Sequence, residues 1–332
     1  MRKKTKWILL LLDVILVLGL VVGIFFYQKR TAAREEEEIS QEDLERRYAK
    51  TVSYNGEKAT VRRSLSSILL IGTDNFINDS KQNEIEAFYN SNLADFLVIL
   101  VFDHAAKTVT PFQICRDTMC EVPWISVNGI VGGTEFQQIT FAHTYGSGKE
   151  DSCVNTRNAV SSLLFDAPID NYFAFTMDAV PVMNDLVGGV TVRLEEDLPS
   201  LGPEYLRGAL VTLKGSAALR FVRYRDIELV DSNLPRMSRH RQYMEAFTQA
   251  AREALSKDED LAVKAFRAAE PFLCTDLSVD NISDMVAQLD AYEIMPTVTP
   301  EGEYTMGFEF AEYYVDETSL WECVRQTFCY AP

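Results

Sequence analysis

Short apolar runs separated by polar turns most restrict how this chain folds. The segments Ser67–Gly72 and Phe96–Phe102 each carry an almost continuous apolar run. Runs of this length, bounded by glycine or polar residues, are typical of buried strands. Val109–Cys115 follows after a polar turn, which predicts a hairpin. Pro111 places this third strand near a sheet edge or a bulge, because proline lacks the amide hydrogen that a central strand needs.

Helical and strand-like segments alternate along the rest of the chain. Val160, Leu163 and Leu164 have the i, i+3, i+4 spacing of one helix face. We expect helices at about 152–164, 178–186, 235–255, 260–269, 281–290 and 319–328. We expect further strands at 171–176, 190–194 and 218–224. This interleaving predicts an α/β domain with a mixed central β-sheet flanked by helices.

The N-terminus carries the second clear signal, a long apolar segment after a basic one. Trp7–Tyr27 is apolar except at Asp13, and its 21 residues would span roughly 31 Å as a helix, which is close to the hydrocarbon thickness of a bilayer. We predict a single-pass transmembrane helix with a cytoplasmic N-terminus and an extracytoplasmic main domain. A cleaved signal peptide is the alternative, although its apolar region usually has about 7–15 residues.

The expected organisation has four parts. Residues 1–30 form the cytoplasmic tip and anchor, and the charge-dense residues 31–63 form an extracytoplasmic stalk. Residues 64–255 form the main domain, and residues 256–332 form a C-terminal helical extension packed on it. Beyond residue 34 the chain has 25 basic and 48 acidic residues. This excess of negative charge argues against nucleic acid as a partner, because such binding rests on basic contacts to phosphate.

The six cysteines are compatible with an exported protein. An even number allows disulfides outside the cell, in any of 15 pairings. Cys120 with Cys153, each in an expected loop, is the pairing we favour, and free thiols are the alternative. The chain has no CxxC motif and its three histidines are isolated, which makes a structural zinc site improbable.

Arginines are concentrated in one stretch of the sequence. Six of them and no lysine occur between Gly215 and Glu245. On the expected strand Arg223 and Arg225 point to one face, and on the following helix Arg236 and Arg239 share a face with His240 close by. Arginine binds phosphate oxygens with two hydrogen bonds and stays charged, which suits a diphosphate. The alternative is that these arginines form surface salt bridges with neighbouring acidic residues.

Two aspartates and one further arginine mark the ends of the expected strands. Asp74 follows the first strand, Asp95 precedes the second, and Arg116 follows the third within Arg116-Asp117-Thr118. Two carboxylates at neighbouring strand ends can hold Mg²⁺, which prefers few carboxylates together with phosphate and water. The alternative for each aspartate alone is a role in a turn or at a helix N-terminus.

These segments together resemble the successive motifs of the LytR-CpsA-Psr family. The resemblance covers about Ser67 to Phe247 and includes Gly72-Thr73-Asp74, Ala94-Asp95, Arg116-Asp117-Thr118, Asp185-Leu-Val-Gly-Gly-Val-Thr-Val192, Leu213-Lys-Gly215, Ala218-Leu-Arg-Phe-Val-Arg-Tyr-Arg225 and Arg236-Met-Ser-Arg239. The Gly-Gly-Val and Arg-Tyr-Arg segments in this order are specific to the family.

The resemblance implies a transferase of the cell envelope. Family members bind a polyprenyl pyrophosphate, with the diphosphate on arginines and the lipid tail in an apolar groove. They transfer the attached glycopolymer to a peptidoglycan hydroxyl, which forms a phosphodiester and releases polyprenyl phosphate. By this resemblance Asp74 and Asp95 hold Mg²⁺, and Asp74 also helps to activate the acceptor hydroxyl. The resemblance also implies that the diphosphate is bound by Arg116, Arg223, Arg225, Arg236 and Arg239. We predict that Arg116 acts with the two aspartates in catalysis and that His240 adds a further contact to the diphosphate.

Two positions depart from the family pattern. Members usually have arginine two residues before the second aspartate, where this chain has Leu93. They usually have glutamine where this chain has His240, which we expect to donate to phosphate more readily at mildly acid pH. The missing arginine motivates an alternative function, a protein that binds polyprenyl pyrophosphate, or regulates the envelope, without catalysing transfer.

Overall fold

The computed structural model describes residues 50–76, 89–126, 129–226, 229–258, 260–288, 291–308 and 310–331. The predicted anchor, residues 1–30, and residues 31–49 of the predicted stalk lie outside the described residues. Contacts divide the chain into Met1–Thr51 and a compact unit, Val52–Pro332. Within the described ranges, no helix has both the length and the apolar character needed to cross a bilayer.

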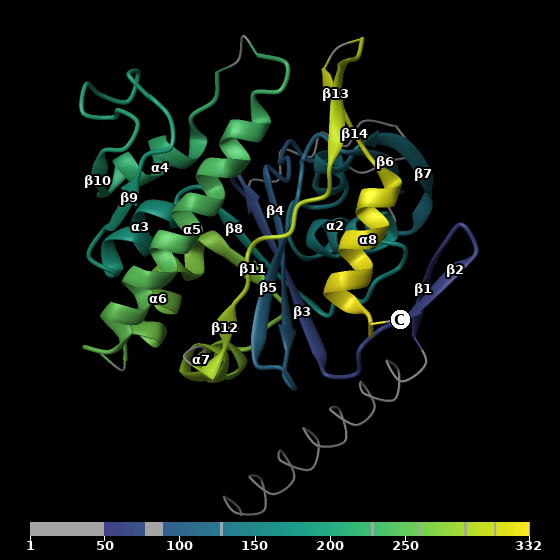
Figure 1. Ribbon diagram of the computed structural model, residues 1–332, viewed down its shortest axis with the longest axis horizontal. Helices are drawn as coiled ribbons and strands as arrows, with labels where there is room; N and C mark the ends of the chain where they lie inside the picture. The colour runs from purple at the N-terminus through teal and green to yellow at the C-terminus, as the bar shows by residue number, and fades with distance from the viewer. Residues whose placement is uncertain are drawn as a thin grey trace, which may run out of the picture. The chain divides into compact units, whose positions relative to one another are not determined.

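A mixed six-stranded sheet forms the centre of the compact unit (Figure 1). In spatial order its strands are β11 (Leu273–Thr275), β8 (Asn171–Thr176), β3 (Leu65–Thr73), β4 (Phe96–Asp103), β5 (Thr108–Ile114) and β12 (Glu293–Ile294). β8 runs parallel to β3 and β12 runs parallel to β5, whereas the other neighbours are antiparallel. The predicted hairpin of β4 and β5 is confirmed, and so is the predicted fold class, a mixed sheet flanked by helices.

Pro111 lies near the sheet edge, as its sequence position predicts. Outside β5 the sheet continues only with the two residues of β12 and a bridge from Phe112 to Val298 among the described residues. The Pro111 carbonyl accepts a hydrogen bond from the Val298 amide at 2.8 Å. The nitrogen and carbonyl of one strand residue point to the same side. The proline nitrogen therefore faces this short outer segment, and the pairing of β5 with β4 loses no donor.

Helices cover both faces of the sheet (Figure 1). Alternate residues of a strand point to opposite faces, so Leu69 and Ile71 enter one core while Leu70 faces the other side. The first core is completed by η1 (Ile139–Thr144), α2 (Glu150–Leu163) and α8 (Glu317–Phe328). The opposite face is covered by α3 (Ala179–Leu186), α5 (Asn233–Leu255), α6 (Leu261–Ala269) and α7 (Val279–Gln288).

One predicted element is wrong. Residues 218–224, expected as a strand, form most of the helix α4 (Ser216–Arg223) and its C-terminal cap, Tyr224. Its buried side chains are Ala218, Phe221 and Val222, whose i, i+3, i+4 spacing is helical. Gly215 precedes the helix with φ of 49°, a left-handed conformation that favours glycine and turns the chain into the helix.

Small two-stranded sheets surround the central one. They pair β1 (Thr51–Tyr54) with β2 (Glu57–Thr60), β6 (Met119–Ile125) with β7 (Val131–Gln138), β9 (Val190–Arg193) with β10 (Leu210–Leu213), and β13 (Gly302–Met306) with β14 (Ala311–Val315). Val52 and Val61 are fully buried in the first core, so residues 52–61, which we expected in the stalk, pack as part of the folded unit. The C-terminal segment is not purely helical, because it supplies β11–β14 as well as η2 (Glu270–Phe272).

The cysteines are free thiols. All six are described without a disulfide, so the favoured pairing of Cys120 with Cys153 is not formed. The Cys153 sulfur lies 3.7 Å from Nε2 of His143, whose Nδ1 lies 3.0 Å from the carbonyl oxygen of Asn92. Nδ1 therefore donates to that carbonyl, and Nε2 is left to accept from the thiol.

We predict that the free energy of unfolding falls as pH falls, because His143 is buried in its neutral form. Burial lowers the pKa of His143 to about 4. In the unfolded chain His143 is protonated below its usual pKa of about 6.5, whereas in the folded chain it stays neutral down to about pH 4. The free energy of unfolding therefore falls as the pH is lowered through this window. Between pH 7.5 and pH 5 the loss from this group is about 2 kcal/mol.

The test is urea unfolding of wild type and His143→Gln at both pH values. The variant should lose about 2 kcal/mol less than wild type over this interval, because glutamine does not titrate. Ala105→Gln, which introduces glutamine at an exposed turn position without removing a titrating group, is the control and should keep the wild-type slope. An unchanged slope in His143→Gln would contradict the assignment.

Candidate functional site

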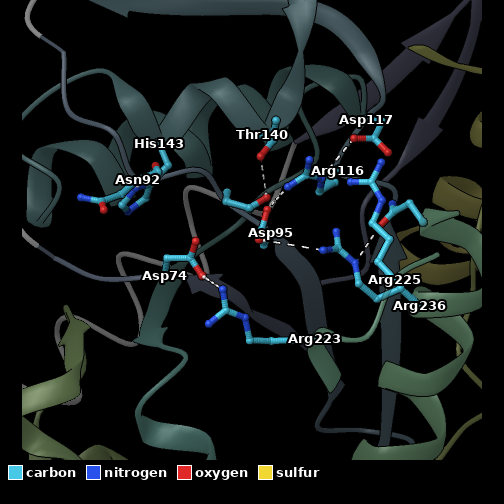
Figure 2. A network of polar contacts seen from close by, with 12 residues as sticks. Asp74, Asn92, Asp95, Arg116, Asp117, Thr140, His143, Arg223, Arg225 and Arg236 are labelled. Carbon is cyan, nitrogen blue, oxygen red and sulfur yellow. Dashed lines mark hydrogen bonds and ion pairs between the residues drawn. The ribbon is translucent and has the colours of Figure 1, made fainter. Parts of the chain in front are cut away.

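The candidate site lies where β3 ends and β4 begins. Asp74 directly follows β3 and Asp95 directly precedes β4. The two strands are antiparallel, with Gly72 opposite Phe96, and the Asp95 amide donates to the Gly72 carbonyl at 2.8 Å. This pairing places the two aspartates at neighbouring strand ends. Figure 2 shows their side chains within one cluster of arginines.

Asp95 links two arginines that are far apart in the sequence. Its Oδ1 accepts from Nη1 of Arg116, which follows β5, and its Oδ2 lies 3.9 Å from Nη1 of Arg236 on α5 (Figure 2). All three side chains are largely buried. A paired, partly desolvated carboxylate of this kind fixes the direction of both guanidinium groups.

Asp74 contacts a third arginine at a more open position. Nη2 of Arg223, the last residue of α4, lies 3.2 Å from Oδ1 of Asp74. Both side chains are 53% exposed. A pair this accessible contributes little to stability and can rearrange around a ligand.

Arg225 completes the group of arginines. It lies in the loop after α4, and its Nε donates to the Ser232 hydroxyl at 2.7 Å. Figure 2 shows it beside Arg236. The predicted pairing of Arg223 and Arg225 on one strand face is wrong, because these residues lie on a helix end and a loop, yet both side chains reach the same cluster.

The positive charge of the arginine cluster is only partly balanced by the neighbouring aspartates. Burial alone would lower the pKa of Arg116, but the charges of Asp95 and Asp117 outweigh burial and raise it. The pKa of Arg236 is lowered by burial and also by the charges of Arg116 and Arg225, which Asp95 only partly offsets. Nη2 of Arg236 is buried and has no hydrogen-bond partner among the described residues. An anion would relieve this repulsion and take up the free donor.

Arg239 and His240 have other partners than the two aspartates. The Arg239 guanidinium donates to Glu196 and to the carbonyl of Tyr224, and it stacks over the Tyr224 ring at 5.1 Å. Because Tyr224 separates Arg223 from Arg225 in the sequence, Arg239 holds the segment that carries them.

His240 is buried beneath this segment. Its Nε2 lies 2.9 Å from the Val222 carbonyl, to which it donates. Burial, and then the charge of Arg236, lower its pKa to about 3, so the ring is neutral even at mildly acid pH. The protonated His240 that the sequence suggested for phosphate is therefore not what this geometry supplies.

Several residues of the site were missed by sequence reasoning. Asp117 is buried and accepts from Nε of Arg116 at 3.1 Å, and the Tyr304 hydroxyl of β13 donates to its other oxygen at 2.9 Å. Asn233 accepts from Nε of Arg236 at 2.9 Å. The motif Arg116-Asp117-Thr118 pointed to Asp117, but Tyr304 is 187 residues away and carried no local signal.

A large apolar pocket opens beside the cluster. Its volume is about 410 Å³, and it lies between the sheet and helices α3, α5, α6 and α7. The sheet contributes Leu70, Phe96, Phe173 and Phe175, and the helices contribute mainly alanine, leucine, valine, methionine and phenylalanine side chains. Phe96 follows Asp95 directly, and Val222 and His240 also line the wall, so the pocket and the arginine cluster share a boundary.

The two aspartates fit a magnesium ion by donor type. Mg²⁺ prefers one or two carboxylates and completes its shell with phosphate oxygens and water. Asp74 and Asp95 are two such carboxylates at neighbouring strand ends. No larger group of His, Cys, Asp or Glu side chains suited to a metal occurs within the ranges that the structure describes.

Comparisons with known proteins show which family and which relatives this chain resembles. The sequence profile of the LytR_cpsA_psr family matches residues 22–327. A Bacillus subtilis (strain 168) protein named polyisoprenyl-teichoic acid–peptidoglycan teichoic acid transferase TagU is 26% identical over 291 residues, which cover 86% of this chain and 82% of TagU.

Solved structures share the fold. The structure titled "TagT bound to LI-WTA" has a TM-score of 0.60 and 19% identity, and the match covers 80% of this chain and 89% of that one. The crystal structure of B. subtilis TagU has a TM-score of 0.54 and 21% identity, with 79% and 95% covered. Since the family profile spans far more than half of the sequence, this chain belongs to the LytR-CpsA-Psr family.

Proposed function

We propose that this protein transfers a glycopolymer from a polyprenyl-pyrophosphate carrier to a hydroxyl of peptidoglycan. The observation that carries the proposal is the shared boundary between a cluster of arginines with spare positive charge and an apolar pocket. A lipid diphosphate has these two properties in one molecule, an anionic head and a long apolar tail. The relative TagU is named for transfer of polyisoprenyl-linked teichoic acid to peptidoglycan, which supports the same class of reaction here.

Each part of the site has a defined task in this reaction. Arg116, Arg223, Arg225 and Arg236 bind the diphosphate and stabilise the charge that builds up on the transferred phosphoryl group. The acceptor hydroxyl oxygen forms a bond to the phosphorus that carries the glycan. The bond from that phosphorus to the bridging oxygen breaks, and polyprenyl phosphate leaves. Asp74 takes the proton of the hydroxyl.

We also propose that Asp74 and Asp95 hold Mg²⁺. When bound, the ion would neutralise charge on the phosphate oxygens. Asp95 would then orient Arg116 and Arg236 and contribute one carboxylate oxygen to the metal, because a carboxylate can accept from several directions at once.

The proposed location is the outer face of the cell membrane. The apolar segment Trp7–Tyr27 after a basic N-terminus supports a single-pass anchor with the folded unit outside. A membrane-impermeant label applied to intact cells should react with lysines of the folded unit. Labelling that appears only after lysis would refute this orientation.

We predict that Asp95→Asn lowers turnover by about 100-fold or more, because it weakens both the metal site and the orientation of Arg116 and Arg236. The measurement is release of polyprenyl phosphate by the full-length protein in detergent, with and without Mg²⁺ and a chelator. Wild type should require Mg²⁺.

The control for this prediction is Asp258→Asn, which removes an exposed ion pair with Lys264 and should keep wild-type turnover. Circular dichroism checks that Asp95→Asn is folded. Wild-type turnover in folded Asp95→Asn would refute the site. Donor binding without any release by wild type would instead favour a non-catalytic lipid-binding protein.

We predict that a bulky side chain in the apolar pocket weakens the binding of long-tailed donors more than that of short-tailed donors. Ala265 lines the pocket, and Ala265→Trp would occupy part of its volume. The apparent affinity for a long polyprenyl donor should fall by about tenfold, whereas a donor with a short tail that does not reach α6 should be affected little. Ala105→Trp, in the exposed turn between β4 and β5, is the size-matched control. An equal effect of Ala265→Trp on both donors would show that the tail binds elsewhere.

A further inference from the structure

The β13–β14 hairpin is fastened along its length to the arginine motif and to the end of β7. The Tyr313 amide donates to the Asp117 carbonyl at 3.0 Å, and the Tyr304 hydroxyl donates to the Asp117 carboxylate. Gln138, at the end of β7, donates to the Ala311 carbonyl at 2.6 Å. These contacts fix the hairpin beside the candidate site, and its tip extends away from the sheet (Figure 1).

The tip of this hairpin is strongly apolar and exposed. Met306 is 69% exposed, Phe308 is fully exposed and Phe310 is 56% exposed. The Phe310 ring lies 6.3 Å from the ring of Phe141, a residue of η1. We call Phe141, Met306, Phe308 and Phe310 the aromatic patch. Exposed apolar groups gathered at one place mark binding surfaces.

The aromatic patch adjoins the reacting centre. Phe141 follows Thr140, whose amide donates to the Arg116 carbonyl at 3.0 Å and whose hydroxyl donates to the Ala94 carbonyl at 3.0 Å. Thr140 therefore contacts Arg116 and Ala94, the residue before Asp95 (Figure 2). Phe141 is the member of the patch nearest this centre in the chain, and Phe310 reaches it through the contact of their two rings.

The aromatic patch and the apolar pocket lie on opposite sides of the sheet. Phe96, Leu70 and Phe175 face the pocket, whereas η1 packs into the core on the other face through Ile139 and Ala142. In phosphoryl transfer the attacking and leaving oxygens lie roughly in line on opposite sides of the phosphorus. If the lipid phosphate leaves toward the pocket, the acceptor hydroxyl arrives from the side of the patch.

Charge favours a glycan over a bilayer as the occupant. Residues 300–316 contain five acidic residues, Glu301, Glu303, Glu309, Glu312 and Asp316, and no lysine or arginine. Anionic lipid surfaces attract basic segments and repel acidic ones. A sugar chain offers apolar ring faces that stack on aromatic side chains and hydroxyl groups that donate to carboxylates.

We propose that the aromatic patch is the subsite for the acceptor, a glycan strand of N-acetylated hexosamine units. This inference rests on the proposed function, because it names where the acceptor of that reaction binds. Phe308 and Phe310 stack on the sugar rings and place one hydroxyl toward the phosphorus bound at Arg116. They act by positioning and take no part in proton transfer.

Binding of the acceptor can be measured without turnover. The probes are a β-1,4-linked N-acetylglucosamine pentamer and soluble peptidoglycan strands, titrated by calorimetry into the full-length protein in detergent. Phe308→Ala/Phe310→Ala should weaken binding by about tenfold or more, since two aromatic faces are lost. Phe308→Tyr/Phe310→Tyr should bind as wild type does. Tyr330→Ala, which removes an exposed aromatic ring near the C-terminus, should also leave binding unchanged.

Turnover separates this inference from the proposed function. In the alanine double variant the KM for acceptor should rise while kcat and the affinity for the lipid donor stay near wild type. Equal binding of both probes by wild type and the double variant would overturn the subsite, whereas absence of transfer by wild type would overturn the proposed function itself.

A bilayer contact is the competing outcome. In a Trp7→Phe background, which removes the tryptophan of the predicted anchor, Phe308→Trp in nanodiscs with brominated lipids should be quenched no more than Trp124 and Trp321, and its fluorescence should shift to the blue when glycan strands are added. Strong additional quenching by the lipid would assign the tip to the membrane surface and overturn the proposal.

Discussion

The ion pairs of Asp95 with Arg116 and Arg236 are the interactions on which the site depends. They join the residue after β5 to the start of β4 and to α5, in addition to the β4–β5 ladder and the hydrogen bond from Arg241 of α5 to Gln113 of β5. Removal of one partner from such a buried pair leaves an uncompensated charge, which typically costs about 3–5 kcal/mol. Arg116 and Arg236 repel each other, and the negative charge of Asp95 between them partly offsets this repulsion.

That arrangement is incomplete without an anion. Arg116, Arg225 and Arg236 share the negative charge of Asp95 and Asp117, and the pKa of Arg236 is lowered partly by its two positive neighbours. The excess is local, because the whole chain has a net charge of -17. A diphosphate would be attracted to this point and to few others, so the acidic surface adds selectivity to the affinity that the arginines provide.

Much of the fold and part of the site could be predicted from the sequence. The central strands follow from short apolar runs, and the aspartates and arginines follow from their place at strand ends and in the arginine-rich stretch. The helix α4 was mistaken for a strand because a short apolar run is ambiguous, and Ala218, Phe221 and Val222 fit a helix face equally well. Tyr304 and the walls of the pocket could not be predicted, since they depend on how the C-terminal segment returns to the sheet.

The structure explains His240 and Leu93, the two departures from the family pattern, in different ways. His240 does not substitute for a phosphate ligand. Its ring donates to the Val222 carbonyl, which lies in the last turn of α4 and lacks a partner within the helix. A neutral side chain suits this role, because the ring also lines an apolar pocket. Leu93 removes one possible cation, but Arg223, at the exposed end of α4, keeps a positive charge next to Asp74.

The C-terminal hairpin connects the acceptor side of the site to the donor side. Tyr304 donates to Asp117, and Asp117 in turn orients Arg116. A glycan seated on Phe308 and Phe310 would press on the same hairpin that carries Tyr304. Two hydrogen bonds, from Tyr304 to Asp117 and from Arg116 to Asp117, therefore connect this hairpin to the guanidinium group that we propose binds the diphosphate.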